Sequence, residues 1–434
     1  MSVYWAEYAW LPRGLAESVS IEVDGAVIRS VAIGAERSGK MLAGLTIPGF
    51  ANAHSHAFHR VLRGRTHHDR GTFWTWRERM YAVAARLDPD SYYRLARGVY
   101  AEMVLAGYTS VGEFHYLHHG PDGARYDDPN AMSAALAAAA ADAGIRLTLL
   151  DTCYLSGGFG WKLDEHQRRF SDGDVGAWAE RAAAFTPTTD LVRTGVAAHS
   201  VRAVPPAALG VVAQQAAGRP VHVHLSEQPA ENRDCLAAHG RTPTALLAAT
   251  GMLGPRTTAV HATHVTEADI RLLAGMRAGV CFCPTTERDL GDGIGPGRAL
   301  ADAGVRLCLG SDSHAVVDAF EEWRALELNE RLASRSRGRF APGQLYSAAT
   351  DHGSIGWPEV GRIEAGAAAD LVTVDLDSVR TAGADPAAAL YAATASDVRE
   401  VLVAGEAVVS EHRHLRVESP ETVLREEIAA LLRA

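Results

Sequence analysis

The sequence predicts an α/β fold, a (β/α)8 TIM-like barrel that carries a small β-sandwich domain built from both chain ends. Three observations support this prediction. The central part of the chain alternates short apolar strands with long helical stretches rich in Ala and Arg. Eight such strands fit into roughly 300 residues, which is the size of a barrel of this kind. Beyond Gly361 the pattern returns to short strands without long helices between them.

The predicted barrel covers residues 47–361. Its strands are expected at residues 47–56, 110–116, 146–154, 192–200, 220–227, 258–264, 279–284 and 306–313, with helices between them, for example at 131–143 and 266–276. An open, doubly wound sheet is the structural alternative. That alternative is disfavoured because no Gly-rich phosphate-binding loop follows the first strand.

The predicted composite β-sandwich domain joins residues 1–46 to residues 362–434. At the N-terminal end, Asp24-Gly25 separates two alternating segments and is a hairpin signal. At the other end, strands are expected at 369–374 and 398–409, with a turn at Ala404-Gly405. Neither end is large enough for a core of its own, so we expect the two to pair. A final helix over 420–432 is expected at the periphery.

Composition narrows the class of protein. The 434 residues are 47% hydrophobic and 22% charged, and the net charge of −10 disfavours nucleic acid and anionic membranes as partners. No apolar run approaches the roughly 20 residues of a membrane span, and the first residues lack the features of an export signal. The five cysteines are an odd number at scattered positions, so no disulfide framework is expected. We therefore expect a cytoplasmic protein.

Three histidines and one aspartate form the candidate metal site. His54 and His56 lie two residues apart on the first predicted strand, so both side chains project to one face. An isolated His-x-His is usually a surface pair, but here polar residues end six predicted strands, where a barrel has its active site. His224 and Asp312 would complete three imidazoles and a carboxylate around one divalent ion, with one position left for water. These donors suit Zn²⁺, the expected metal, and also Fe²⁺.

Two choices between histidines remain open at this point. His222 shares a strand face with His224, and the spacing His224-x-x-Glu227 favours His224 as the ligand, with His222 deeper in the barrel. His261 is nearer to its strand end than His264, which fits a loop or a helix cap.

The same strand ends supply candidate catalytic groups. Glu227 lies close enough to the metal site to transfer a proton, and Asp312 is placed to accept one from water. His261 would orient the attacking oxygen. We expect hydrolysis by a metal-activated hydroxide.

The pattern of these residues resembles the amidohydrolase superfamily, in its mononuclear deaminase branch. The segments that carry this resemblance are His54-x-His56, His224-x-x-Glu227, His261, Ser311-Asp312 and Gly361-Arg-Ile-Glu-Ala-Gly-x-x-Ala-Asp370. Binuclear members of the superfamily bridge two metals with a carbamylated lysine on the fourth strand. The only two lysines, Lys40 and Lys162, are not placed for this, so one metal per chain is expected.

A narrower resemblance is to the formimidoylglutamate deiminases of histidine degradation. It rests on Phe73-Trp-Thr-Trp-Arg77-Glu, Glu113-Phe-His-Tyr116-x-His-His119, His199-Ser-x-Arg202-Ala-Val and Leu290-Gly-Asp-Gly-Ile294. It implies hydrolytic deimination of N-formimidoyl-L-glutamate to N-formyl-L-glutamate and ammonia, and a homodimer.

The implied substrate is a small dicarboxylate, and the planar guanidinium of arginine binds a carboxylate through two hydrogen bonds. By the resemblance, Arg77 and Arg202 hold the substrate carboxylates, and Tyr116 and His199 make further contacts. His59 occupies a substrate-contact position at which the family has glutamine. A histidine there still donates a hydrogen bond to a carboxylate or a carbonyl.

Two rival functions remain. The first is another mononuclear deaminase of the superfamily that acts on a nucleobase or another amidine, whose pocket would favour stacking aromatic rings over arginines. The second is a non-catalytic scaffold of the same fold, which is disfavoured because the full set of metal ligands is present.

Overall fold

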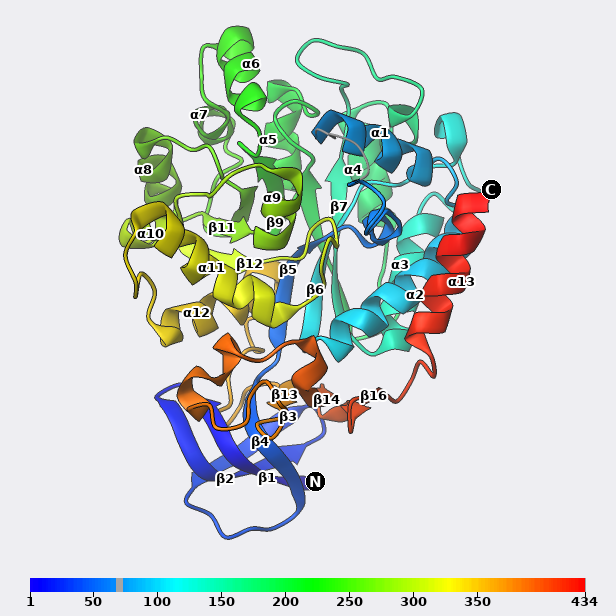
Figure 1. The fold of residues 1–434 in the computed structure, drawn as a ribbon. Helices are drawn as coiled ribbons and strands as arrows, with labels where there is room; N and C mark the ends of the chain where they lie inside the picture. Colours follow the sequence, from blue (N-terminus) through cyan, green and yellow to red (C-terminus); the bar gives the residue numbers. More distant parts are fainter. Residues whose placement is uncertain (68–72, 434) are drawn as a thin grey trace.

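The computed structural model describes residues 1–67 and 73–433. A ring of strands surrounded by helices forms the larger part of the molecule, and a smaller sheet beneath it carries the N-terminus (Figure 1). The C-terminal helix α13 (Pro420–Arg433) lies along the side of the larger part, next to α2 (Pro89–Leu105).

The larger part is a parallel barrel, as predicted. Its strands follow one another in chain order as β5(Phe50–Ser55), β6(Tyr108–His115), β7(Arg146–Cys153), β8(Val192–Ala198), β9(Val221–Leu225), β10(Thr257–His261), β11(Gly279–Phe282) and β12(Arg306–Leu309). Between β12 and β5 the ring is closed by the backbone of candidate metal ligands. The Asp312 N–H donates to the His54 carbonyl at 3.0 Å, and the His56 N–H donates to the Asp312 carbonyl at 3.2 Å.

The first barrel strand is shorter than predicted. Ile47 and Pro48 belong to β4 (Lys40–Pro48) of the smaller sheet, where Pro48 pairs with Leu371. The chain passes from one sheet to the other at Gly49, where a Cβ atom would lie only 2.2 Å from the Thr109 hydroxyl oxygen. The prediction of one continuous strand over 47–56 was therefore wrong. The strand is interrupted where the chain changes sheet, and the residue at that crossover has to be glycine.

Helices cover the outside of the barrel (Figure 1). They are α1(Phe73–Ala84), α2(Pro89–Leu105), α3(Ala131–Ala143), α4(Val175–Ala184), α5(Pro206–Gln215), α6(Pro229–His239), α7(Pro243–Ala249), α8(Glu267–Gly275), α9(Pro284–Leu290), α10(Gly297–Asp302), α11(Ala319–Ser334) and α12(Pro342–Ala349). The short 3-10 helix η1 (Ala57–Leu62) follows β5 directly and leads toward α1.

The smaller sheet combines both ends of the chain. Its strand order is β16-β15-β14-β13-β4-β1-β2-β3, with bounds β1(Ser2–Leu11), β2(Gly14–Asp24), β3(Val27–Ile33), β13(Leu371–Val374), β14(Val398–Val403), β15(Glu406–Ser410) and β16(Arg413–His414). An isolated bridge between Val27 and Ala368 brings the β3 edge back toward β13, and the enclosed side chains form a small separate core. The boundaries 1–46 with 362–434, and 47–361, stay a prediction.

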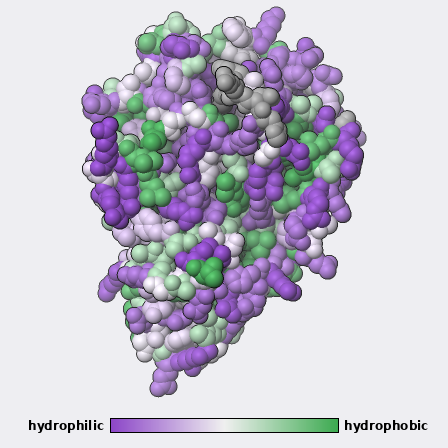
Figure 2. All heavy atoms as spheres, in the orientation of Figure 1, coloured by the Kyte–Doolittle hydropathy of each residue, from purple (hydrophilic) through white to green (hydrophobic). Residues whose placement is uncertain are grey.

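The surface in Figure 2 is mainly hydrophilic, and its hydrophobic side chains gather in small separate patches. None of the helices in the described ranges combines the length and the apolar character that a bilayer crossing needs. All five cysteines are buried and free.

Candidate metal and active site

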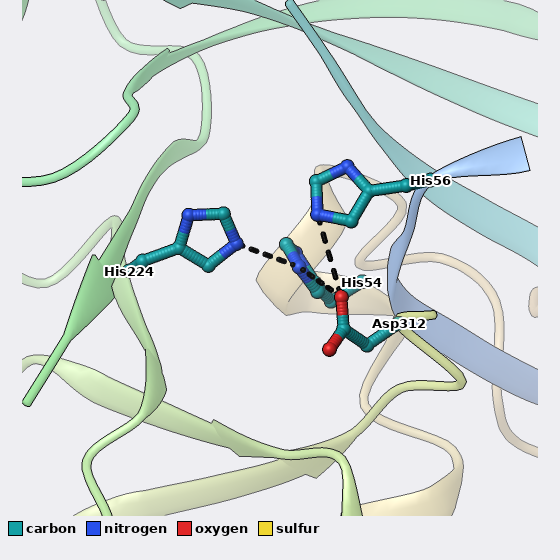
Figure 3. A group of neighbouring side chains, drawn as sticks. All are labelled: His54, His56, His224 and Asp312. Atoms are coloured by element: carbon teal, nitrogen blue, oxygen red, sulfur yellow. Dashed lines mark hydrogen bonds and ion pairs between the residues drawn. The ribbon is translucent and has the colours of Figure 1, made fainter. Parts of the chain in front are cut away.

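The predicted metal ligands converge at the carboxyl ends of the barrel strands (Figure 3). One nitrogen from each of His54, His56 and His224 and one oxygen of Asp312 all lie within 4.8 Å of one another. Asp312 Oδ1 is 3.3 Å from His54 Nε2 and 3.4 Å from His56 Nε2. His224 Nε2 lies 3.1 Å from His54 Nε2. All four side chains are buried.

Hydrogen bonds to backbone carbonyls fix the tautomers of two ligands. His56 Nδ1 donates to the Phe114 carbonyl at 2.9 Å, and His224 Nδ1 donates to the His199 carbonyl at 2.9 Å. With Nδ1 protonated, Nε2 of a neutral imidazole carries the lone pair. Burial lowers the pKa of both histidines well below the usual value, which favours this neutral, metal-binding form.

This arrangement fits a divalent cation. The lone pair of His56 Nε2 lies 3.4 Å from Asp312 Oδ1, and that of His224 Nε2 belongs to the same group of donors. Lone pairs and a negative charge at such short range repel one another unless a cation lies between them. The donor set of three nitrogens and one oxygen is also that of mononuclear hydrolytic metal sites.

The three candidate catalytic residues lie beside this group. His261 Nε2 is 3.8 Å from Glu227 Oε1 and 3.8 Å from Asp312 Oδ2. Burial is the main cause that raises the pKa of Glu227, to about 7, so this carboxyl is able to exchange protons near neutral pH. Burial alone would lower the pKa of His261, but nearby carboxylates outweigh it and raise the pKa to about 10.

The backbone is strained where these side chains leave their strands. Ser226, His261 and Asp312 have φ angles of 50°, 72° and 43°, in the left-handed region that residues other than glycine rarely adopt. Each such conformation costs on the order of 1–3 kcal/mol and is typical of functional sites. His261 and Asp312 line the pocket, and Ser226 lies between His224 and Glu227, which also line it.

Close packing also fixes His54. A Cβ atom on Gly310 would lie 2.8 Å from His54 Cβ and 2.9 Å from the His54 backbone nitrogen. Only glycine allows β12 to approach β5 this closely, just before the chain reaches Asp312.

A pocket opens beside the candidate metal site, and His56, His224 and Asp312 belong to its lining. Its lining includes all five predicted substrate contacts, His59, Arg77, Tyr116, His199 and Arg202. Trp76 and Leu290, which belong to the motifs of the narrower resemblance, also line the pocket. Further walls come from Met80, Tyr81, Tyr154 and Phe170, which the sequence did not single out. The pocket is therefore aromatic, with two arginine side chains at its surface.

Two acidic residues at the site were missed by sequence reasoning. Glu231, on α6, accepts from Arg202 Nε at 3.4 Å. Glu287, on α9, has Oε1 3.4 Å from His261 Nδ1 and accepts from the Cys283 N–H at 2.9 Å. Both stand in the first turn of a helix that directly follows a strand end carrying site residues, and that position was the available signal.

Two polar residues of β6, Glu113 and His115, make contacts away from the metal group. Glu113 accepts from Ser55 Oγ and the Ala57 N–H, and the ring of His115 lies 6.2 Å from that of Tyr92 on α2. Strand alternation explains this, because Phe114 and Tyr116, not their neighbours, pack against site histidines. Of this motif, Phe114 and Tyr116 therefore face the site histidines.

The structure agrees with the preference for His224 over His222 and for His261 over His264. His222 lies deeper, where Nε2 contacts the Ser354 carbonyl at 3.0 Å, and His224 belongs to the metal group. His264 follows β10 in a turn, and its carbonyl accepts from Asn232. His261 reaches the site.

The model of the amidohydrolase family matches residues 45–408. The chain belongs to the amidohydrolase family. It is 40% identical to the formimidoylglutamate deiminase of Pseudomonas aeruginosa, over 95% of this chain and 96% of that protein. It is 31% identical to a 5-methylthioadenosine/S-adenosylhomocysteine deaminase of Natronomonas pharaonis, over 88% of this chain and 85% of that protein.

A crystal structure of an amidohydrolase from Brucella melitensis covers the whole chain with a TM-score of 0.91 and 34% identity. The family assignment predicted from the histidine motifs is confirmed, and with it a hydrolase of the amidohydrolase type. In this amidohydrolase the fourth barrel strand, β8, has no lysine, so the described chain has no bridging residue of the binuclear kind.

Proposed function

We propose that this amidohydrolase hydrolyses N-formimidoyl-L-glutamate to N-formyl-L-glutamate and ammonia. The observation that carries the proposal is the pair of arginines, Arg77 and Arg202, in the wall of a pocket whose floor is a three-histidine, one-aspartate site. The substrate offers two carboxylates for the arginines and one amidine carbon for the site. The 40% identity to a formimidoylglutamate deiminase along nearly the full length supports it.

The resident cofactor is one divalent metal ion per chain, held by His54, His56, His224 and Asp312, and Zn²⁺ is the ion we propose, with Fe²⁺ as the alternative. When bound, such an ion supplies Lewis acidity that lets water act as a nucleophile near neutral pH.

The side chains of the chain divide the remaining work. Arg77 and Arg202, both in the pocket lining, bind the carboxylates and orient the formimidoyl carbon toward the barrel centre. Asp312 Oδ2 accepts the proton from the attacking water. His261, whose Nε2 lies 3.8 Å from Asp312 Oδ2, donates a hydrogen bond to the incoming oxygen.

Glu227 completes the reaction. Its pKa of about 7 suits proton transfer to the terminal nitrogen of the substrate. The proton that Asp312 accepted then passes to the same nitrogen, and the remaining hydroxyl proton returns to Glu227. The bond between the former amidine carbon and that nitrogen breaks, ammonia leaves, and the new carbonyl of the formyl group remains. The aromatic wall of Trp76, Tyr81 and Phe170 limits the access of bulk water.

A product assay tests the proposal. Metal-loaded protein and N-formimidoyl-L-glutamate should yield ammonia and N-formyl-L-glutamate in equal amounts, detected by an enzymatic ammonia assay and by mass spectrometry. N-formimidoylglycine, which has a single carboxylate, should react with a much higher KM. Turnover of a nucleobase with none of N-formimidoyl-L-glutamate would contradict the proposal.

The homodimer that the resemblance implies and the cytoplasmic location expected from the sequence belong to the same proposal and stay predictions. Size-exclusion chromatography with light scattering tests the first of them.

A further inference from the structure

The two carboxylate oxygens of Asp312 face different groups. Oδ1 is the oxygen near His54 and His56, at 3.3 and 3.4 Å. Oδ2 is turned toward His261, with 3.8 Å between it and Nε2. A carboxylate placed in this way is able to bridge two cations.

Cys283 completes a second group of donors on the Oδ2 side. A nitrogen of His261, the sulfur of Cys283 and an oxygen of Asp312 lie within 4.8 Å of one another, and all three residues are buried. They come from three neighbouring barrel strands, because Cys283 directly follows β11, between β10 and β12. Imidazole, thiolate and carboxylate are all established ligands of zinc.

We propose that His261, Cys283 and Asp312 form a second metal-binding position that takes a thiophilic divalent cation, Zn²⁺ or Cd²⁺, and inhibits the enzyme when it is filled. This position shares Asp312 with the group of His54, His56 and His224 but adds a sulfur ligand that the first group lacks. It is not the bridged pair of binuclear amidohydrolases, since no lysine takes part.

Inhibition follows from the residues that the second cation occupies. An ion on His261 removes the hydrogen-bond donor for the incoming oxygen, and an ion on Asp312 Oδ2 removes the proton acceptor. This consequence rests on the proposed function, whereas binding of the cation does not.

The donor set also predicts selectivity. Sulfur favours Zn²⁺ and Cd²⁺ over hard ions such as Mg²⁺ and Mn²⁺, which prefer oxygen ligands. His261 and Asp312 line the pocket, so a cation reaches them from the mouth of the barrel. Excess Cd²⁺ should therefore inhibit, and equal concentrations of Mg²⁺ should not.

Metal binding tests the position independently of turnover. Protein that holds one zinc per chain is dialysed against Cd²⁺, and bound metal is counted. A parallel sample receives Co²⁺, whose bond to a thiolate gives a charge-transfer band in the near ultraviolet. The wild-type chain should take up a second equivalent and show the band.

Variants assign the second ion to Cys283. Cys283→Ala should weaken uptake of the second equivalent at least tenfold and remove the cobalt band, while the first zinc stays bound. Cys308→Ala is the matched control, because it removes another buried thiol from the adjacent strand but none from the donor group. Cys283→Ser, which keeps the size of the side chain, should lose the band in the same way if the alanine variant folds poorly.

Either of two results would overturn the proposal: a wild-type chain that binds one metal only, or a Cys283→Ala chain that binds the second with unchanged affinity and band. When a second equivalent of metal is added, ammonia release should fall in wild type and in Cys308→Ala. It should not fall in Cys283→Ala. Second-ion binding without any turnover of N-formimidoyl-L-glutamate would contradict the proposed function and leave the second position standing.

Discussion

The carboxylate of Glu231 accepts a hydrogen bond from Nε of Arg202 at 3.4 Å. The Glu231 side chain is 1% exposed and that of Arg202 is 22% exposed, so the acid supports the arginine from the protein side. The other Glu231 oxygen accepts from the Ser226 N–H at 3.3 Å, which ties the pair to the strand end between His224 and Glu227. The contact with Glu231 uses Nε of Arg202 and not its two terminal nitrogens. Those two nitrogens are also able to bind a substrate carboxylate.

Glu231→Gln should therefore weaken substrate binding more than it slows the chemical step. We expect KM to rise about tenfold, equivalent to about 1.4 kcal/mol, with kcat within about twofold of wild type. Steady-state kinetics of ammonia release measure both constants. Glu267→Gln, at an exposed position on α8, is the control and should change neither. A fall in kcat at constant KM would show that Glu231 acts on the reaction itself.

Glu287 should have the opposite kinetic signature, because it contacts His261 and not a substrate-binding arginine. Groups that orient a catalytic side chain from behind typically contribute 10- to 100-fold. Glu287→Gln should lower kcat within that range and leave KM nearly unchanged. Asp289→Asn, two residues further along α9, provides a comparison and should retain activity. Equal loss in both variants would point to damage to the helix.

Gly310→Ala should reduce metal binding without changing any ligand. The added methyl group would displace His54, because its Cβ would come within 2.9 Å of the His54 backbone. We expect less than one metal per chain by elemental analysis and a proportional loss of kcat. Gly275→Ala, where a Cβ meets nothing within 4 Å, should bind metal normally. Full metal content in Gly310→Ala would show that β5 and β12 are less tightly fixed than their packing indicates.

His352 should make the fold sensitive to acid. Its Nε2 donates to the Gly49 carbonyl at 2.8 Å, Nδ1 lies 2.6 Å from Ser110 Oγ, and burial lowers its pKa to about 4. An unfolded histidine titrates near pH 6.5, so between about pH 6.5 and 4 the unfolded chain binds the extra proton. Stability is thus retained above this window and falls as the pH decreases through it.

The test compares thermal unfolding of wild type and His352→Gln at pH 7, 6, 5 and 4.5. As the pH decreases, the unfolding midpoint of wild type should fall more steeply than that of His352→Gln. The variant lacks the one proton that His352 takes up on unfolding, so the dependence of its stability on pH should be smaller by that amount. Parallel curves would show that His352 is not a source of acid sensitivity.

Local patterns in the sequence were sufficient for the barrel and for the positions of the metal donors. The i, i+2 spacing placed His54 and His56 on one face, and the His224-x-x-Glu227 spacing distinguished His224 from His222. Glu231 and Glu287 were missed because an acid in the first turn of a helix usually stabilises the helix end. Only the folded barrel shows that these two acids reach Arg202 and His261.

The motif Glu113-Phe-His-Tyr116 does not by itself specify which of its side chains face the site. Alternation along β6 sends Phe114 and Tyr116 toward the site and Glu113 toward α2, but a motif read as a block hides that alternation. The roles assigned to the pocket residues stay predictions until kinetics test them.

The most direct test of the central claim compares kcat/KM for two substrates, N-formimidoyl-L-glutamate and 5′-methylthioadenosine. Both are measured with zinc-loaded wild type and with zinc-loaded Arg202→Met. We predict a preference of at least about a thousandfold for N-formimidoyl-L-glutamate in wild type, most of it lost in the variant, because a carboxylate would then lack its bidentate partner. Equal or better turnover of the nucleoside by wild type, with no ammonia from N-formimidoyl-L-glutamate, would contradict the account.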